Sequence, residues 1–420
     1  MTGVARAEII AIGTELLLGD TIDGNGAWLG HVLAAGGIAV ARRAVVGDNA
    51  RDIQDAVEEA LERSGCVICS GGLGPTRDDI TKTAVARLFQ RDMVMDAGWL
   101  DELERRYSER GWMLTESSRG QALVPRDATV LHNTRGTAPG LALEDERGVV
   151  ILLPGVPHEL RGLTEQSVLP LLRARWSGAL PPVLSLRLRT AGVPESVLAE
   201  GIDDLVDGFA PLTLAYLPSS EGVDLRLTSW GLPEAEARTR FTVAEAELRT
   251  RLGPVIYGSG AEDLAAAVGR ELVARGLTLA VAESCTGGLV AKRLTDAPGA
   301  SEFLIEGFVT YANEAKQNTL GVAAAVLVKH GAVSEATARA MALGARARAG
   351  TDCALSITGV AGPDGGTVEK PVGTVWIAAA VHDRLEARRI NVLGDRAHVR
   401  DRSAQAALTL LRDMVLETVT

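Results

Sequence analysis

Residues 277–288 read LTLAVAESCTGG, and this stretch decides how the C-terminal part of the chain folds. The apolar run 277–283 predicts a buried strand, because it is short and ends at a turn signal. Gly287 and Gly288 then allow a tight loop, and residues 289–294 predict a helix directly after it. A strand that leads through a glycine loop into a helix presents unpaired backbone N–H groups, which favours a bound anion or oxyanion.

Three side chains of this loop carry a reactive or a capping group. Ser284, Cys285 and Thr286 lie between the expected strand and the expected helix, where a hydroxyl or thiol is a candidate nucleophile. The alternative is structural, since Ser284 or Thr286 can accept a hydrogen bond from the first helical amides and only cap the helix. The spacing of the residues leaves both interpretations open.

Other polar groups follow the neighbouring strands of the same region. Strands are expected at 305–311, 353–358 and 372–381, and helices at 262–275, 334–349 and 396–417. Loops at the carboxyl ends of strands converge on one crevice in an open α/β sheet. That crevice is therefore expected to collect side chains and loop N–H groups from these residues: Ser284, Thr286, Gly287, Gly288, Tyr311, Lys316, Thr358, Gly359, Arg396 and Arg400.

The rest of the chain divides by its pattern into two further regions. Strands at 8–12, 40–46, 66–69 and 149–153 alternate with helices at 26–35, 50–63, 79–90 and 97–109. After Pro181-Pro182, half-exposed strands at 183–190 and 222–229 accompany helices at 196–206 and 234–251. The fold class is thus α/β: two α/β sandwich domains with mostly parallel sheets, 1–172 and 258–420, joined by a small α+β domain, 176–252.

Composition restricts the classes of partner. The 420 residues are 46% hydrophobic and 23% charged, which is typical of a globular protein. A net charge of -11 argues against a broad basic surface, so direct DNA binding is not expected. No apolar run reaches the roughly 18 residues of a membrane helix. Cys66 and Cys69 have the spacing of a redox pair, but the apolar strand that contains them favours buried core thiols. We expect a cytoplasmic protein that forms a homodimer.

The N-terminal region has two strand-to-loop transitions of the kind that cradles phosphates. The strand 66–69 leads into a loop with Gly71, Gly72 and Gly74, without the Gly-Lys-Ser/Thr of a Walker A loop. Four carboxylates follow the strands of this region and are candidate ligands for a divalent metal ion held against phosphates: Glu15, Asp48, Asp78 and Asp79. The alternative for the last two is a helix cap and a charge favoured by the helix dipole.

Five segments of residues 262–420 resemble a known domain. AESCTGG (282–288), GFVTYANEAK (307–316), HGAVSE (330–335), TGVAGPDGG (358–366) and KPVGTVW (370–376) look like the nicotinamide-nucleotide amidase domain of the competence/damage-inducible protein A (CinA) family. The resemblance implies hydrolysis of nicotinamide mononucleotide to nicotinic acid mononucleotide and ammonia, without a cofactor. It also implies roles for individual residues, with Ser284 as nucleophile, Lys316 as general base, Tyr311 for orientation or proton transfer, Thr358 as support and Arg396 for the phosphate. Cys285 remains the rival nucleophile, and Arg400 or Arg402 the rival phosphate ligand.

Residues 5–170 resemble the molybdopterin-binding-like domain at the front of the same family. The resemblance implies a metal-dependent ADP-ribose pyrophosphatase, using Co²⁺ or Mg²⁺, that gives AMP and ribose 5-phosphate; a pterin- or nucleotide-binding module without hydrolysis is the alternative. Residues 176–252 resemble a KH-like fold but lack the Gly-x-x-Gly loop of RNA binding. The whole is expected to be a bifunctional pyridine-nucleotide salvage enzyme acting on small nucleotides. The competing hypothesis is a non-enzymatic regulator of competence or of the DNA damage response.

Overall fold

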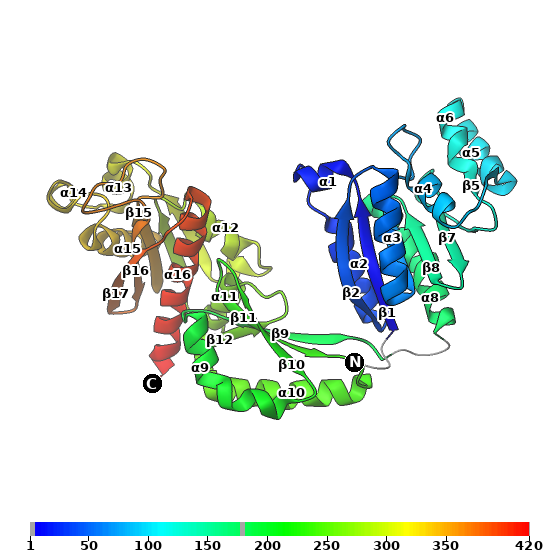
Figure 1. Ribbon diagram of the computed structural model, residues 1–420. Coiled ribbons are helices and arrows are strands. Elements are labelled where there is room, and N and C mark those ends of the chain that lie inside the picture. The colour runs from blue at the N-terminus through cyan, green and yellow to red at the C-terminus, as the bar shows by residue number, and fades with distance from the viewer. Residues whose placement is uncertain (1–4, 177–180, 420) are drawn as a thin grey trace. The chain divides into compact units, whose positions relative to one another are not determined.

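The protein divides into two compact units. The computed structural model describes residues 5–176 and 181–419. One unit comprises Met1–Leu184 with Thr228–Thr239, and the other comprises Ser185–Leu227 with Arg240–Thr420 (Figure 1). Within the described residues, no helix is long and apolar enough to cross a membrane.

The first unit is built on a six-stranded sheet with the order β2-β1-β3-β8-β7-β6. Its strands are β1 (Ala5–Ile12), β2 (Ile38–Val46), β3 (Cys66–Ser70), β6 (Thr129–Leu131), β7 (Gly140–Asp145) and β8 (Gly148–Leu153). Strands β2, β1, β3 and β8 are parallel, whereas β7 and β6 add an antiparallel edge. A two-stranded ribbon, β4 (Met93–Met95) and β5 (Leu123–Pro125), lies outside this sheet.

Helices cover both faces of this sheet, as the alternation of elements predicts. The helices of this unit are α1 (Thr14–Leu18), α2 (Gly24–Ala35), α3 (Ala50–Ser64), α4 (Thr81–Leu88), α5 (Ala97–Glu109), α6 (Glu116–Arg119), α7 (Pro157–Leu163) and α8 (Leu169–Arg175). Helices α3 and α4 pack on one face of the sheet, and α2, α7 and α8 pack on the other. Cys69 packs in the cluster beneath α3 and α4, and Cys66 in the cluster on the other face with α2. Side chains alternate along a strand, so the two thiols point apart. Both thiols are 0% exposed, which confirms that they belong to the core, and this burial raises the pKa of each to about 12.

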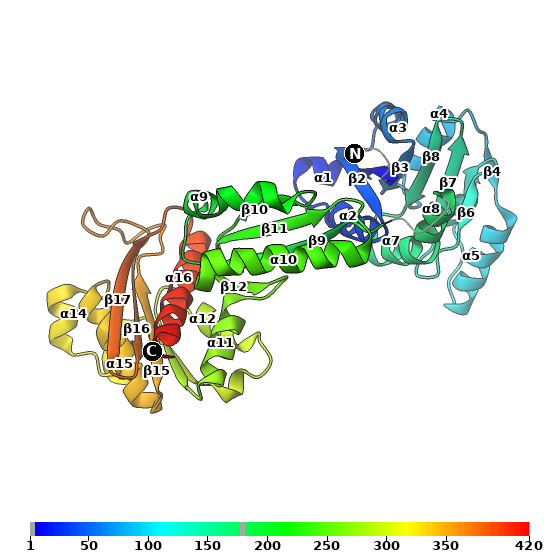
Figure 2. The ribbon, with the colours of Figure 1, turned by 90° about the horizontal axis from the view of Figure 1, so that it is seen from below.

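The middle of the chain forms a four-stranded sheet with the order β10-β11-β9-β12. Its elements are β9 (Leu184–Thr190), α9 (Glu195–Val206), β10 (Thr213–Pro218), β11 (Val223–Ser229), α10 (Glu234–Leu252) and β12 (Ile256–Ser259). Helices α9 and α10 run along this sheet (Figure 2), and Arg251 of α10 forms an ion pair of 2.7 Å with Asp204 of α9. Both α9 and α10 match the helices expected from the sequence, whereas β10 and β12 were not predicted.

The C-terminal sheet has the order β14-β13-β15-β16-β17. Its elements are α11 (Leu264–Ala274), β13 (Leu279–Glu283), α12 (Leu289–Thr295), β14 (Leu304–Val309), α13 (Asn313–Leu320), α14 (Ala324–His330), α15 (Glu335–Ala349), β15 (Cys353–Gly359), β16 (Thr374–Val381), β17 (Arg384–Asn391) and α16 (Arg396–Leu416). Strands β14, β13 and β15 are parallel, and β16 and β17 pair antiparallel. The carboxyl ends of β14, β13 and β15 therefore meet at one edge, with β13 in the middle.

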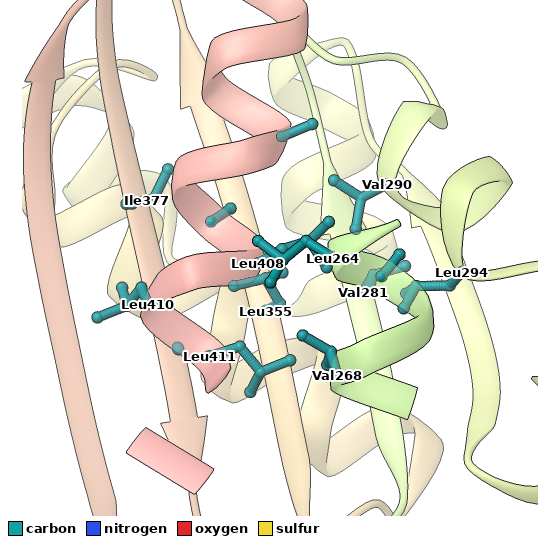
Figure 3. Packing of buried hydrophobic residues seen from close by; sticks show 14 of the residues in the cluster. Leu264, Val268, Val281, Val290, Leu294, Leu355, Ile377, Leu408, Leu410 and Leu411 are labelled. Atoms are coloured by element: carbon teal, nitrogen blue, oxygen red, sulfur yellow. The ribbon is translucent and has the colours of Figure 1, made fainter. Parts of the chain in front are cut away.

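Alternate residues of β13 supply the two cores of this sheet. Leu279 and Val281 pack with α11 and α16, while Ala280 and Ala282 pack on the α15 side. Figure 3 shows side chains from α11, β13, α12, β15 and α16 converging in the larger core. Truncating one such leucine to alanine removes about 2–5 kcal/mol of stability. The residues that follow β13 are thus held on a rigid base.

Candidate active site

Ser284 and Lys316 meet at the carboxyl edge of the C-terminal sheet. Ser284 follows the last residue of β13, and its amide donates to the carbonyl of Ile357 in β15 at 3.0 Å. Lys316 lies on α13, the helix that follows β14. Its Nζ donates to Ser284 Oγ at 3.0 Å, across 32 positions of sequence. The expected convergence of strand ends thus brings a hydroxyl and an amine into contact.

The amine of Lys316 is fully enclosed. The side chain is 0% exposed, and Nζ also donates to the carbonyls of Thr310 at 2.8 Å and Tyr311 at 3.0 Å. Burial lowers the pKa of this ammonium below its ordinary value, because the charged form loses its hydration. The two carbonyls each accept from one N–H group of Lys316, so the third substituent position of its nitrogen points at Ser284 Oγ. A neutral Lys316 would present its lone pair there.

Cys285, the rival nucleophile, lies in the hydrophobic core. It belongs to the same buried cluster as Leu264, Val281 and Val290. Burial raises the pKa of its thiol to about 11, which disfavours the thiolate at neutral pH. The geometry and the electrostatics both favour Ser284 as the nucleophile.

The helix after the loop is capped by Glu283 and not by Ser284 or Thr286. The Glu283 carboxylate accepts hydrogen bonds from the amides of Gly288 at 3.0 Å, Val290 at 3.1 Å and Ala291 at 2.9 Å. The sequence-based capping hypothesis is therefore wrong, because a carboxylate already occupies the start of α12. The sequence signal was a charge at the end of an otherwise apolar strand.

This cap also changes which amides can bind an oxyanion. The amides of Gly287 and Gly288 donate to the carbonyl of Ser284 and to Glu283, at 3.1 and 3.0 Å. Among the described residues, no acceptor is found for the amides of Cys285 and Thr286. The expected oxyanion contacts near Gly287 thus shift towards Cys285 and Thr286, the two amides that follow the candidate nucleophile.

Two residues close to Ser284 and Lys316 along the chain carry buried hydroxyls. Thr286 Oγ1 and Thr310 Oγ1 have no hydrogen-bond partner within residues 5–176 and 181–419. Leaving a buried hydroxyl unpaired costs about 1–3 kcal/mol, so such groups often mark a binding site. The unpaired Thr286 hydroxyl is in keeping with the substrate-binding role expected of this residue.

The arginines of α16 have different partners. Arg396 donates to the phenol oxygen of Tyr311 at 3.1 Å and to the carbonyl of Gly362 at 2.7 Å. Arg400 Nη2 donates to the carbonyl of Thr286 at 2.7 Å, so Arg400 fastens the loop that follows Ser284. Arg396 is exposed, and two of its five N–H donors are used, so it is the better placed of the two for an external anion.

Tyr311, Thr358 and Gly359 act here through the backbone or through packing. Tyr311 contacts Lys316 with its carbonyl, and its exposed ring reaches Arg396. The Thr358 hydroxyl donates to the carbonyl of Ala332 at 2.8 Å, so it supports a neighbouring loop. A Cβ at Gly359 would lie 2.9 Å from the carbonyl of Thr374, which explains the glycine by close strand packing.

A second candidate site is a cavity of about 370 Å³ in the first unit. The loops after β1, β3 and β8 line it, together with the predicted phosphate-loop glycines Gly71, Gly72 and Gly74. Gly71 has φ 115°, and a Cβ there would lie 2.1 Å from the carbonyl of Ile12. Glycine is therefore needed for the β1 and β3 loops to approach each other.

The four predicted metal ligands line this same cavity: Glu15, Asp48, Asp78 and Asp79. Asp48 accepts hydrogen bonds from the amide and hydroxyl of Thr14, both at 2.9 Å, and Asp79 accepts from the amide of Thr76 at 2.8 Å. In the described part of the chain, no three His, Cys, Asp or Glu side chains form a group that could hold a metal ion. The expected carboxylate cluster is not preformed. The donor oxygens fit an ion that also takes ligands from a substrate's phosphates.

Sequence reasoning missed Gln121 and the position of Glu159 in this cavity. Gln121 is 2% exposed, lines the cavity, and its Oε1 has no hydrogen-bond partner among the described residues. Glu159 also lines the cavity and accepts from Asn133 at 2.6 Å. No repeat or spacing marks Gln121, which lies in the short stretch after α6.

The chain is similar to known protein families over almost its whole length. The chain matches the CinA C-terminal domain over 261–415, a probable molybdopterin binding domain over 8–174 and the damage-inducible protein CinA KH domain over 185–258. A CinA-like protein of Gemmatimonas aurantiaca is 52% identical over 96% of this chain and 95% of its own length. A putative competence-damage inducible protein of Symbiobacterium thermophilum is 47% identical over 98% of this chain and 99% of its own. A crystal structure of a competence-damaged protein (CinA) superfamily protein from Klebsiella pneumoniae is 40% identical, with a TM-score of 0.36 over 37% of this chain and 96% of that one. By sequence over nearly its whole length, the chain belongs to the CinA family.

Proposed function

We propose that the C-terminal domain hydrolyses the carboxamide of nicotinamide mononucleotide to nicotinic acid mononucleotide and ammonia. The observation that carries this proposal is the hydrogen bond of 3.0 Å between the buried amine of Lys316 and Ser284 Oγ. A nucleophile in contact with a base whose pKa is lowered is the arrangement that acyl transfer needs.

The first step uses the neutral form of Lys316. Ser284 Oγ attacks the carboxamide carbon while its proton passes to Lys316 Nζ, and the carbonyl oxygen becomes an oxyanion. The amides of Cys285 and Thr286 are the donors with no acceptor among the described residues, so they are assigned to that oxygen. Lys316 is then an ammonium, held by the carbonyls of Thr310 and Tyr311.

The second step returns the proton. The Lys316 ammonium protonates the leaving nitrogen, the C–N bond breaks, and ammonia departs from an acyl-enzyme on Ser284. A water molecule, deprotonated by the same amine, attacks the ester. The Lys316 ammonium then returns this proton to Ser284 Oγ as the C–O bond breaks, which releases the carboxylic acid and restores the neutral amine. Arg396 is assigned to the phosphate of the nucleotide, because its exposed guanidinium retains free donors.

Ammonia release from nicotinamide mononucleotide tests this proposal directly. The full chain is assayed with and without a chelator, beside Ser284→Ala and the matched variant Cys285→Ala. We expect turnover that chelation leaves unchanged, loss of turnover in Ser284→Ala and much of it kept in Cys285→Ala. Absence of release by the unaltered chain, or the reverse order of the two variants, contradicts the assignment.

A second activity is proposed for the first unit, the hydrolysis of ADP-ribose to AMP and ribose 5-phosphate. The supporting observation is one cavity that joins three glycine-containing loops to four carboxylates. A divalent ion such as Co²⁺ or Mg²⁺, when bound with the substrate, supplies a Lewis acid for the phosphoryl oxygens. Glu15, Asp48, Asp78 and Asp79 are the side chains that would hold it, and the glycine loops would bind the phosphates.

AMP release from ADP-ribose by the full chain distinguishes an enzyme from a binding module. The assay is run with Co²⁺, with Mg²⁺ and with chelator, for the unaltered chain and for Asp78→Ala. We expect metal-dependent release that Asp78→Ala lowers. Binding of ADP-ribose without release would favour a non-hydrolytic nucleotide-binding domain, and unchanged turnover in Asp78→Ala would contradict a role of Asp78 in metal binding.

A further inference from the structure

A cavity of about 360 Å³ lies within the second unit, apart from the residues of the Ser284 site. Loop residues 192–194 and 221–222 form one wall, and β16, β17 and α16 form the other. Its volume is within the range of small-molecule sites. Neither proposed reaction uses any of its lining residues.

Two arginines supply this cavity with N–H donors, which favour an anion. Arg388 and Arg402 both line it. Arg388 forms ion pairs of 3.6 Å with Glu386 and 3.7 Å with Asp413, but both distances are longer than a hydrogen bond, so neither carboxylate accepts from its N–H groups. Arg402 donates to the carbonyl of Ser220 at 3.2 Å and keeps other donors. Two guanidinium groups are therefore available to one ligand.

The one carboxylate in the lining is already neutralised. Glu221 forms an ion pair with Arg189, which is itself nearly buried. The remaining wall carries five apolar side chains: Val193, Pro194, Ile377, Ile390 and Ala406. A ligand that matches both features carries a carboxylate or phosphate on an apolar body.

The walls are closely fitted. A Cβ at Gly192 would lie 3.2 Å from Thr409 Cγ2, and a Cβ at Gly222 would lie 2.3 Å from the carbonyl of Thr190. Gln405, 5% exposed, donates from Nε2 to the carbonyl of Glu221. These contacts join the loops of the middle sheet to α16 and keep the cavity in shape.

The helix that lines this cavity also holds the nucleophile loop. Arg400, two residues before Arg402 on α16, donates to the carbonyl of Thr286. Gln405 Oε1 accepts from Arg293 of α12 at 2.9 Å, so the cavity wall and the helix after Ser284 share one side chain. A ligand that fixes this stretch of α16 therefore acts on an element that fastens the loop.

We propose that this cavity is a regulatory site for a small anion with an apolar body, and that its occupancy further stabilises the already ordered Ser284–Gly288 loop through α16. The ligand's carboxylate or phosphate binds Arg388 and Arg402, and its apolar part lies against Ile377 and Ile390.

Binding is tested with phenyl phosphate as the probe, by calorimetry on the full chain. Inorganic phosphate lacks the apolar body and benzyl alcohol lacks the charge, so both are expected to bind at least about tenfold more weakly. Arg388→Gln with Arg402→Gln should weaken phenyl phosphate about tenfold or more. Arg389→Gln is the matched control, because Arg389 is the next residue on β17 and so projects to the opposite face.

Hydrogen exchange of the same samples tests the coupling. Phenyl phosphate should slow exchange in peptides covering α16 and the Ser284–Gly288 loop of the unaltered chain and of Arg389→Gln, but not in the double variant. Ala406→Phe, which places a ring in the cavity without removing a charge, should also abolish binding. Equal binding to the double variant overturns the site, and binding without slower loop exchange overturns its regulatory role. Because none of these readouts is amidase turnover, they succeed or fail independently of the proposed reaction.

Discussion

The two candidate sites are built differently, although both lie where parallel strands end in loops. At the C-terminal site, Lys316 is fully buried and contacts Ser284 directly, so the reacting groups are already assembled. In the first unit, the carboxylates line an open cavity without forming a metal-binding group among the described residues. The first site thus depends on a few fixed contacts, and the second depends on what its ligand brings.

Replacement of Lys316 has the largest expected effect. Lys316→Met keeps the apolar stem but removes the base, so kcat for amide hydrolysis should fall about 10³-fold. The variant should unfold at a lower temperature, since the carbonyls of Thr310 and Tyr311 lose their donor, so kcat is compared well below that temperature. Lys292→Met is the control, because Lys292 is exposed and pairs with Asp296. Activity within a few-fold of the unaltered chain would exclude Lys316 as the base.

The pH profile gives an independent reading of the same residue. Burial lowers the pKa of Lys316, and only its neutral form accepts a proton. Activity should therefore rise with pH through this lowered pKa, with a midpoint below the ordinary lysine pKa of about 10.4. Lys316→Arg stays charged and should lose the rising limb. A profile whose midpoint lies at the ordinary lysine pKa would contradict a lowered pKa of Lys316.

Glu283 comes next, because it fixes the loop rather than reacting. In the native chain, the Glu283 carboxylate accepts from three backbone N–H groups at the start of α12. Glu283→Gln replaces one carboxylate oxygen by an NH₂ group, which cannot accept, so about 1–3 kcal/mol of stability should be lost. Misplacement of Ser284 should lower kcat about 10²-fold, with a smaller change in KM. Glu306→Gln, on the exposed side of β14, is the control for a neutral glutamine on a neighbouring strand. An unchanged kcat in a destabilised Glu283→Gln would limit Glu283 to a structural role.

The same contrast explains how much the sequence predicted. The helix α5 has the predicted bounds, and β13 and α15 lie within two residues of theirs, because their apolar periodicity is strong and caps or glycines mark their ends. β17, with the sequence RLEARRIN, was missed, since its charged residues hide the alternation of an edge strand. The helices α13 and α14 were missed because each is short and only a few of its residues are buried.

The site residues divide in the same way. The meeting of Ser284 and Lys316 was predictable because each follows a recognisable strand, and the order of strands brings their loops together; their roles were predicted from the family resemblance alone. The cap by Glu283 and the contact of Arg400 with Thr286 were not, because both are hydrogen bonds to backbone atoms that leave no spacing in the sequence. The positions of Asp78 and Asp79 at one cavity were anticipated, but their separation from the other carboxylates depends on loop conformation.

Arg396 and Arg400 should separate substrate binding from catalysis. Arg396→Gln should raise KM for nicotinamide mononucleotide about tenfold with little change in kcat, because a charge-assisted contact to the phosphate is lost in both ground and transition states. Arg400→Gln should instead lower kcat, since it frees the carbonyl of Thr286 beside the assigned oxyanion donors. Steady-state kinetics of the two variants show which arginine binds the phosphate. The opposite pattern would assign the phosphate to Arg400 instead of Arg396.

The smallest effect is expected in the open cavity, at Gln121. Its amide is buried with an oxygen that has no partner among the described residues, a cost that a ligand donor would remove. Gln121→Leu should therefore leave the unfolding temperature unchanged or higher, yet weaken ADP-ribose binding about fivefold through one lost hydrogen bond. Gln166→Leu is the control, because that amide contacts Thr134 on the exposed surface. Weaker binding together with a lower unfolding temperature would instead show that Gln121 supports the fold.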